Sequence, residues 1–551
     1  MSNGVGLGGA YDATLERIKA QDGEKLKLAM ATLMWVCHSE RSLQADELCH
    51  ALAVEIGSAN FDPDNVPLMA TLLGCCQGLI TVDKEASTVR LIHYTLQEYL
   101  SDYPHLFSTA HSTIAETCLT YLNSRQVKRL PPYPLPDQQS MPFLKYSSRH
   151  WGTHAKREFS DGAMSLALEL LSRYETHISA TSVLKQSRGG YDFGDGFGGA
   201  GSSSLFSALH CASFFGIVEL ATTLVDNKAC GINQRDCTGA TPLLWAAENG
   251  HEEVVMFLLD QENVSSDEPD RQRRTPLWHA ALSGHVGVVK TLLERKDVDP
   301  NYSDNLGWTP LMMSAVRGQE GLIKLLLERK DIDPSCQESL GRTALSLAAA
   351  VGKAGSVKML LEREDVDPNC PDSLGLVALS WAAARGEEGV IRILLEWEDV
   401  DPNCRDLGGR TALWFAAGQG KEGLLKPLLE RKDIDFNCQD NSGRTALWVA
   451  CAFGHEGLVK LLLEQKNIDL NCPNNLGTTA LHVATMLGHE RLVKLLLEQK
   501  NIDPKNCRNN EGSVPLSSAF ATAFEGIANP LVLLMLFALK DAHLNRPDNQ
   551  N

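Results

Sequence analysis

The sequence predicts a mainly α-helical protein whose larger part is a solenoid of repeated helix pairs. Three observations predict it: a 34-residue period, small and apolar residues at helical spacing within each period, and glycines at fixed positions between the helices. With one further copy upstream and one downstream at Leu516, there are about ten repeats over residues 205–545. The most regular mark of the period is a leucine that recurs every 34 residues: Leu243, Leu277, Leu311, Leu345, Leu379, Leu413, Leu447 and Leu481.

Each repeat is predicted to be a turn followed by two helices. A threonine two residues before the leucine, such as Thr309, can cap the first helix, and a proline or alanine follows it at the first helical position. A glycine after the first helix, such as Gly318, suits a left-handed C-cap that reverses the chain. The second helix is apolar on one face, as in residues 458–463, and can bury that face only against neighbouring repeats.

These motifs resemble the ankyrin repeat, including its T-P-L-H-x-A pattern, over roughly 340 residues. The family's period is 33, whereas here the segment between repeats, such as residues 330–334, is one residue longer. The usual glycine after the second helix is absent, so we expect the hairpin to begin differently. Arg273 also stands where the third repeat should have its turn glycine. The resemblance implies a concave groove lined by the turn tips and the ends of the first helices.

The N-terminal 204 residues show no such period and are predicted to be separate from the repeats. We divide them into an N-terminal segment (1–23), a compact unit (24–104), a helical connector (105–185) and a Gly/Ser-rich linker (186–204). The unit 24–104 is predicted to contain three helices, two short strands and a further helix. This is the order of elements in a winged-helix domain.

Two segments of this unit, SERSL at 39–43 and VRLIHYTLQEYL at 89–100, resemble the winged-helix segment of fungal NACHT-type signalling ATPases. In that family the segment follows the nucleotide-binding domain, and ankyrin repeats commonly form the sensor end. The sequence contains no G-x-x-x-x-G-K-[ST] phosphate-binding loop. We therefore expect the chain to correspond to the C-terminal part of such an NLR-like protein, without the NACHT domain and without a bound cofactor.

Charge argues against nucleic-acid and membrane ligands. The 551 residues carry 51 Lys and Arg against 69 Asp and Glu, a net charge of −18, whereas both ligands attract basic surfaces. Residues 42–83 of the winged-helix unit contain six acidic residues and neither lysine nor arginine, so DNA binding is disfavoured. No secretory signal is seen, and the longest apolar run, 530–539, is about half of what a bilayer needs. We expect a cytoplasmic protein.

The in-phase polar residues do not form a predicted catalytic or metal site. The repeated cysteines stand one repeat apart, about 8–10 Å, which is too far for a disulfide or for shared zinc ligation. We expect them to fill a small buried position, and we expect the repeated aspartates to serve turn chemistry. His150 and His154, beside Trp151, are predicted to form a packed aromatic cluster rather than a metal site. The two series are Cys336, Cys370, Cys404, Cys438 and Cys472, and Asp299, Asp333, Asp367, Asp401, Asp435, Asp469 and Asp503.

The predicted recognition surface consists of residues after the turn glycines and at the ends of first helices. Arginine and tryptophan are enriched in binding hot spots, so a row of tip arginines with a tryptophan among them predicts an extended, acidic ligand with an apolar residue. Trp414 and Trp448 are instead expected to lie in the core between repeats. The predicted protein-binding residues are Arg274, Trp308, Arg317, Arg342, Arg385, Arg410, Arg444 and Phe453.

The favoured function is non-enzymatic protein recognition by the groove of an NLR-like fungal signalling or scaffold protein. An alternative is a regulatory fragment whose residues 1–185 dock onto a separate nucleotide-binding ATPase. DNA binding and catalysis are the least favoured functions. The sequence does not indicate an oligomeric state.

Overall fold

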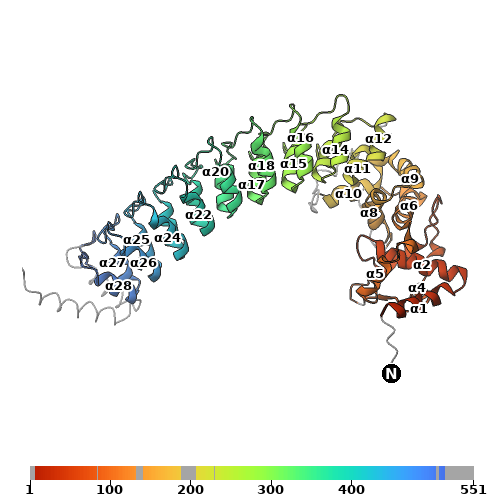
Figure 1. Cartoon of the computed structure of the whole chain (residues 1–551), viewed down its shortest axis with the longest axis horizontal. Coiled ribbons are helices and arrows are strands. Elements are labelled where there is room, and N and C mark those ends of the chain that lie inside the picture. Colours follow the sequence, from red (N-terminus) through yellow and green to blue (C-terminus); the bar gives the residue numbers. More distant parts are fainter. Residues whose placement is uncertain are drawn as a thin grey trace, which may run out of the picture. The chain divides into compact units, whose positions relative to one another are not determined.

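The computed structural model describes residues 7–83, 85–131, 140–187, 206–228, 230–503 and 508–514. The chain divides into two compact units, residues 1–271 and 272–551. Across the described residues the regular elements are helices, apart from one two-stranded sheet (Figure 1). The predicted fold class is confirmed. No helix in these ranges is long and apolar enough to span a bilayer. Outside the described residues lie Leu516, most of the predicted linker, the apolar run at 530–539, and Cys507, which follows Cys472 after one repeat and one inserted residue.

The first unit opens with the predicted winged-helix elements. Strands β1 and β2 pair antiparallel, with Ile80 opposite Leu91 and Val82 opposite Val89. The helix at residues 7–19 packs against the helix that follows the strands, since the hydroxyl groups of Tyr11 and Thr95 lie 2.8 Å apart. The elements are α1 (Leu7–Lys19), α2 (Gly23–His38), α3 (Ala45–Leu52), η1 (Pro63–Asn65), α4 (Met69–Cys75), β1 (Ile80–Val82), β2 (Val89–Leu91) and α5 (Tyr94–Ser101).

The SERSL segment is held by a buried carboxylate. The side chain of Glu47 is fully buried at the start of α3, and it accepts hydrogen bonds of 2.6 and 2.7 Å from Arg41. It also accepts one of 2.9 Å from the backbone N–H of Gln44, which closes the N-terminus of α3. A buried carboxylate is costly unless paired, so these bonds fix the segment to the helix that follows it.

The predicted connector is helical and packs against the first repeat. Trp151 is buried in α8, and its ring lies 5.1 Å from that of Phe215 in α11. A side chain at the neighbouring Gly152 would overlap the Phe215 ring, so glycine is required there. The elements are η2 (Pro104–Phe107), α6 (Ala110–Asn123), α7 (Arg125–Lys128), α8 (Leu144–Arg157), α9 (Asp161–Leu171), η3 (Tyr174–Thr176), α10 (Ile178–Ser187), α11 (Ala208–Phe215), α12 (Val218–Asp226), α13 (Pro242–Glu248) and α14 (Glu252–Leu259).

A histidine cluster lies between α6 and α8. The Nδ1 atoms of His111 and His154 are 2.9 Å apart, and Nε2 of His154 lies 2.8 Å from the hydroxyl of Tyr146. Burial, reinforced by nearby positive groups, lowers the pKa of His154 to about 3 and that of His150 to about 4. These histidines are packed against aromatic rings, as predicted. Among the described residues no three His, Cys, Asp or Glu side chains are placed to hold a metal ion.

The histidine cluster should make the first unit sensitive to acid. In the unfolded chain a histidine titrates near pH 6.5, whereas folded His150 and His154 stay neutral down to about pH 4 and 3. Their contribution to stability is therefore fully present above pH 6.5 and is lost as the pH falls towards those values. We expect protection of α8 amides against hydrogen exchange to fall between pH 7 and 4. The fall in protection should be shallower in the His154→Gln variant. His105 is exposed, so the His105→Asn control should match the wild type. Equal slopes of protection against pH in all three proteins would contradict the prediction.

The second unit is a stack of repeats, each with a hairpin and two antiparallel helices. First helices pack on first helices and second helices on second helices, while the hairpins lie along one edge (Figure 1). The helices are α15 (Pro276–Ser283), α16 (Val286–Leu293), α17 (Pro310–Arg317), α18 (Glu320–Glu328), α19 (Ala344–Ala350), α20 (Ala354–Leu361), α21 (Ala378–Arg385), α22 (Glu388–Leu395), α23 (Ala412–Gln419), α24 (Glu422–Glu430), α25 (Ala446–Ala452), α26 (Glu456–Leu463), α27 (Ala480–Met486) and α28 (Glu490–Leu497).

The helix ends follow the predicted chemistry. The Thr309 side chain accepts a hydrogen bond from the backbone N–H of Met312 at the start of α17, and Gly318 ends that helix with φ of 73°. Val377 replaces the capping threonine of α21, and that helix has no side-chain cap. Arg273, which stands in the turn-glycine position, adopts the same left-handed backbone with φ of 62°. The turn thus keeps its geometry at some strain.

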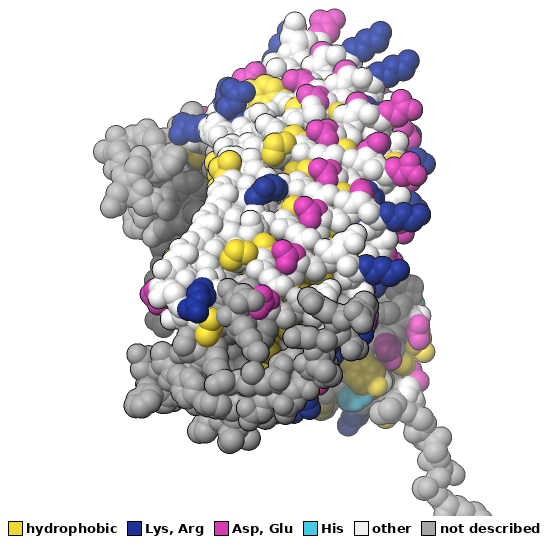
Figure 2. Space-filling view, turned by 90° about the vertical axis from the view of Figure 1, so that its left-hand side faces the viewer, with side chains coloured by type: hydrophobic (Ala, Val, Ile, Leu, Met, Phe, Trp, Pro, Cys, Tyr) yellow, Lys and Arg dark blue, Asp and Glu magenta, His cyan; other side chains and the backbone are white. Residues whose placement is uncertain are grey.

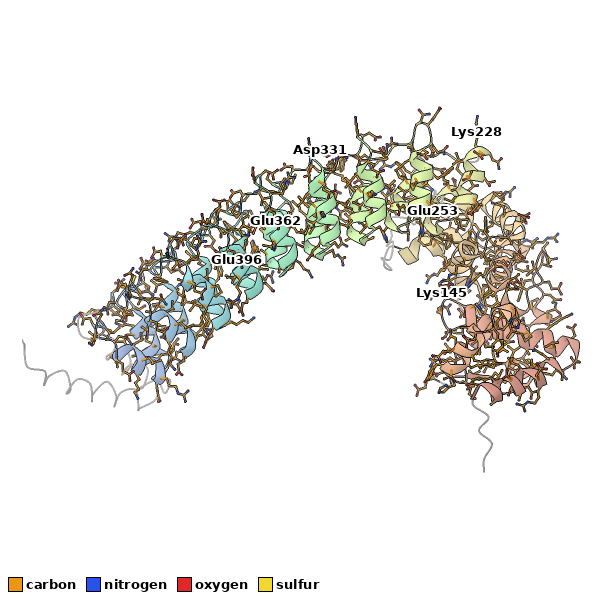
Figure 3. All side chains as sticks on the ribbon, in the orientation of Figure 1. Lys145, Lys228, Glu253, Asp331, Glu362 and Glu396 are labelled. Carbon is orange, nitrogen blue, oxygen red and sulfur yellow. The ribbon has the colours of Figure 1, made fainter. Side chains whose placement is uncertain are left out.

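The start of the hairpin differs from the glycine-ended family pattern, as expected. Arg329 ends α18 in extended backbone, and its guanidinium donates to the carbonyl of Leu293 in the preceding repeat at 2.5 Å. The same guanidinium pairs with Asp331 at 2.6 Å, and Asp331 lies at the hairpin edge (Figure 3). An arginine side chain therefore satisfies helix-end carbonyls that would otherwise lack a donor.

Asparagines tie most hairpins of the second unit to the next one. The side-chain amide of Asn403 donates to the carbonyl of Asp433 at 2.7 Å and accepts from the N–H of Asp435 at 2.8 Å. Ser335 occupies this register in another repeat, and its hydroxyl turns to Asp333 instead. The amides that bridge in this way are those of Asn301, Asn369, Asn403, Asn437 and Asn471.

Pro427 should weaken the second-helix layer locally. It lies inside α24, beyond the first turn, where it lacks the N–H donor and crowds the preceding turn, at a cost of about 3 kcal/mol. Because repeat arrays are stabilised by nearest neighbours, the loosening should stay local. We expect faster hydrogen exchange in residues 421–432 than in 456–466, and slower exchange in 421–432 after Pro427→Leu. Unchanged exchange in that variant would show that the surrounding contacts absorb the defect.

Candidate functional site

The hairpin tips present a row of exposed leucines that the sequence analysis missed. Their side chains are 54–71% exposed, although leucine usually lies in the core. Each stands one or two residues before the turn glycine, and an apolar residue in this otherwise polar turn was the signal in the sequence. Ser442 takes the same register in one repeat. The exposed tip leucines are Leu306, Leu340, Leu374, Leu407 and Leu476.

Three of the predicted tip arginines are bonded inward to carboxylates. In each pair the acidic side chain is only 1–2% exposed and lies four residues earlier, at the base of the same turn. The positive charges are therefore largely compensated before any ligand arrives. The pairs are Arg342–Glu338 (2.8 Å), Arg410–Asp406 (2.6 Å) and Arg444–Asp440 (2.7 Å).

The electrostatics of Glu338 show how closely such a pair depends on its arginine. Burial alone would raise the pKa of Glu338, because the charged form loses its water. The hydrogen bond and charge of Arg342, with backbone N–H donors at Leu340 and Arg342, outweigh burial and hold that pKa below its usual value. Arg342 is thus one of the groups that hold the pKa of this buried carboxyl below its usual value.

The arginines also stack on aromatic rings, which joins the tips to the first-helix ends. The Trp381 ring has the guanidinium of Arg342 at 5.9 Å and that of Arg385, at the end of α21, at 5.7 Å. Trp414 likewise has Arg410 at 5.5 Å and Arg444 at 5.6 Å. Tips and helix ends therefore belong to one surface of the second unit, which we call the recognition face.

The burial of the tryptophans differs from the prediction. Trp414 and Trp448 were predicted to lie in the core, but both are half-buried, and arginines stack on their rings. Trp308 is also half-buried, and its carbonyl accepts a hydrogen bond of 3.0 Å from the indole of Trp278. Arg274 stacks on that same Trp278 ring at 5.3 Å.

The helix-end predictions identify the most accessible side chains of the recognition face. Arg317 and Arg385 are exposed at the ends of α17 and α21, and among the described residues neither pairs with a carboxylate. Phe453 follows α25 and is 63% exposed, a large apolar surface for a single side chain. These three residues carry charge or apolar area that the protein itself does not cover.

The repeated aspartates behave as predicted, and the repeated cysteines do not. Asp401 accepts a hydrogen bond of 2.8 Å from the N–H of Asn403, which is turn chemistry. Cys404 lies half-buried in the hairpin rather than in a small buried position, and its thiol donates to Asp401 at 3.6 Å. Burial and the Asp401 charge raise the pKa of Cys404 to about 12, so its thiol stays protonated. Seen from the C-terminal end, acidic side chains form lengthwise rows along the repeats (Figure 2).

Two known families match parts of the chain. The pattern of ankyrin repeats matches residues 209–304, 296–372, 345–440, 379–474 and 413–507, which together cover more than half of the chain. Residues 15–109 match the winged helix domain of GPI inositol-deacylase. The latter match begins within α1, which packs against α5. A comparison with curated proteins found no match.

Truncation to alanine should destabilise the protein at Arg342 and leave its stability nearly unchanged at Arg317. Arg342→Ala leaves the buried Glu338 carboxylate without its partner, and we expect the free energy of unfolding to fall by about 1–3 kcal/mol. Arg317→Ala removes an exposed side chain without a described partner, so the change should stay within about 0.5 kcal/mol. Urea denaturation of both variants at pH 7 measures the difference. Equal losses would mean that Glu338 finds another donor.

Proposed function

Since the chain belongs to the ankyrin-repeat family, we propose that its second unit binds a protein ligand on the recognition face. The observation that carries this proposal is the row of exposed tip leucines beside the arginine–aromatic stacks. Aromatic and arginine side chains are enriched in protein interfaces, and the burial of exposed apolar area by a partner lowers the free energy of the complex. Catalysis plays no part in this proposal.

The biological setting we propose is an NLR-like fungal signalling or scaffold protein in the cytoplasm. Two features support it: the winged-helix match over residues 15–109 and the resemblance of residues 39–43 and 89–100 to NACHT-type ATPases. The net charge of −18 and the acidic stretch 42–83 support a protein ligand over nucleic acid. In this setting the repeats act as the sensor end.

A second candidate function is docking of the N-terminal region onto a separate nucleotide-binding ATPase. It is favoured by large apolar side chains that are exposed on the winged-helix elements. Ligand binding at the repeats does not explain their exposure. Those side chains are Leu68, Ile92 and Tyr94, of which Leu68 and Tyr94 are the more exposed. Leu68→Ser with Tyr94→Ser should abolish such docking and leave binding at the repeats unchanged.

The recognition face is tested by replacing its leucines with the residue that the chain itself uses elsewhere. Ser442 stands in the tip-leucine register, so Leu340→Ser with Leu374→Ser should leave the fold intact. We expect at least a tenfold loss of affinity for partners captured from a lysate of the source organism, about 1.4 kcal/mol, with melting temperature nearly unchanged. The matched control is Lys324→Ser with Lys358→Ser on the second helices. Loss of capture in the control and retention in the tip variant would move the binding surface to the second helices.

A further inference from the structure

Positive charge on the recognition face is compensated at the tips and uncompensated at the helix ends. Arg342, Arg410 and Arg444 each pair with a buried carboxylate, so they bring little net charge to a ligand. Arg317 and Arg385 are exposed, and among the described residues neither pairs with a carboxylate. On a chain of net charge −18, two such guanidinium groups are the part of this face best suited to anionic side chains.

The spacing of these two arginines corresponds to an extended chain. They occupy the same register two repeats apart, and neighbouring helices pack about 8–10 Å apart, so about 16–20 Å separates them along the array. An extended polypeptide rises about 3.3 Å per residue. Five or six residues of extended chain therefore span the distance from Arg317 to Arg385.

The neighbouring positions of the same register hold apolar side chains and one glutamine rather than basic side chains. Val351 lies between the two arginines and is half exposed, and Phe453 follows Arg385 after two further repeats. Leu306 and Leu374 expose apolar tips in the repeats that hold the two arginines, and Leu340 does so in the repeat between them. The helix-end row thus places two basic groups on either side of an apolar one and continues, after Gln419, with the exposed apolar side chains of Phe453 and Leu487.

We propose that the recognition face selects an extended acidic protein segment, an inference that rests on the proposed function. Two carboxylates five or six residues apart would pair with Arg317 and Arg385, and a large apolar side chain after a similar interval would pack on Phe453. Charge-assisted hydrogen bonds to arginine supply direction, while burial of Phe453 and the tip leucines supplies apolar contact. Two guanidinium groups suit a few carboxylates, whereas a nucleic-acid strand presents a charge at every phosphate.

The test is selection of peptides of about 16 residues from a random display library on the full chain, a length that accommodates both intervals. We expect enriched sequences to carry two acidic residues five or six positions apart and an aromatic or large aliphatic residue at a further interval of that size. A synthetic peptide of the enriched sequence is then titrated calorimetrically. Wild-type affinity should fall as salt is raised, because the exposed charges are screened.

Matched variants separate this inference from the broader proposal. Gln419 stands in the register of Arg385, so Arg317→Gln with Arg385→Gln is a change that the repeat already accommodates. We expect it to weaken the peptide at least tenfold and to remove most of the salt dependence. Lys324→Gln with Lys358→Gln removes the same charge from exposed sites on α18 and α20 and should change affinity less than twofold.

The outcomes have distinct meanings. Enriched peptides without acidic pairs, or unchanged affinity in the arginine variant, would overturn the acidic-segment inference and leave protein recognition standing. Failure of any peptide to enrich, together with failure of the tip-leucine variant to affect capture, would overturn the proposed function itself. If RNA displaced the peptide with an affinity equal to that of the peptide, the arginines would be assigned to a nucleic-acid ligand instead.

Discussion

The second unit depends on a backbone hydrogen bond from each hairpin tip to the tip before it. Ser339 donates to the carbonyl of Leu306 at 2.8 Å, and Ser373 donates to that of Leu340 at 2.9 Å. The turn glycines make this approach possible, since a Cβ at Gly341 would lie 2.9 Å from the Ser373 nitrogen. Tips joined in this way are held at one spacing, and their side chains project as a regular row. The recognition face is a consequence of that stacking.

Charge burial gives the same array its rigidity. A carboxylate at the base of a turn accepts backbone N–H groups of its own hairpin, and in three repeats it also holds the arginine that follows the glycine. The arginine stacks in turn on a tryptophan, so one guanidinium links the turn to an aromatic ring. These arginines therefore stabilise the fold, and in the proposed interaction they would offer a stacked planar surface rather than free charge. Free charge is left to Arg317 and Arg385, where the first helices end.

The first unit follows the same principle with different residues. Glu47 is buried with Arg41 where α3 begins, and His154 is buried with Tyr146 where α8 packs against its neighbours. Polar groups taken from water are satisfied by specific partners, which defines the arrangement more narrowly than apolar packing alone. The acid sensitivity predicted for this unit has the same source, because burial favours the neutral form of His154.

The sequence by itself determined the period, the helix pairs and the helix ends, because these follow from local chemistry. A threonine caps its own helix, a glycine takes a left-handed φ, and apolar spacing repeats with the helical turn, all within one repeat. The tertiary structure alone decided which surface residues are available. Buried Glu338 compensates the charge of Arg342, Leu340 is exposed at a hairpin tip, and Cys404 lies in the hairpin rather than in the helical core. Those outcomes depend on how closely the chain, including adjacent repeats, packs around each side chain. The local sequence around a residue does not determine that packing.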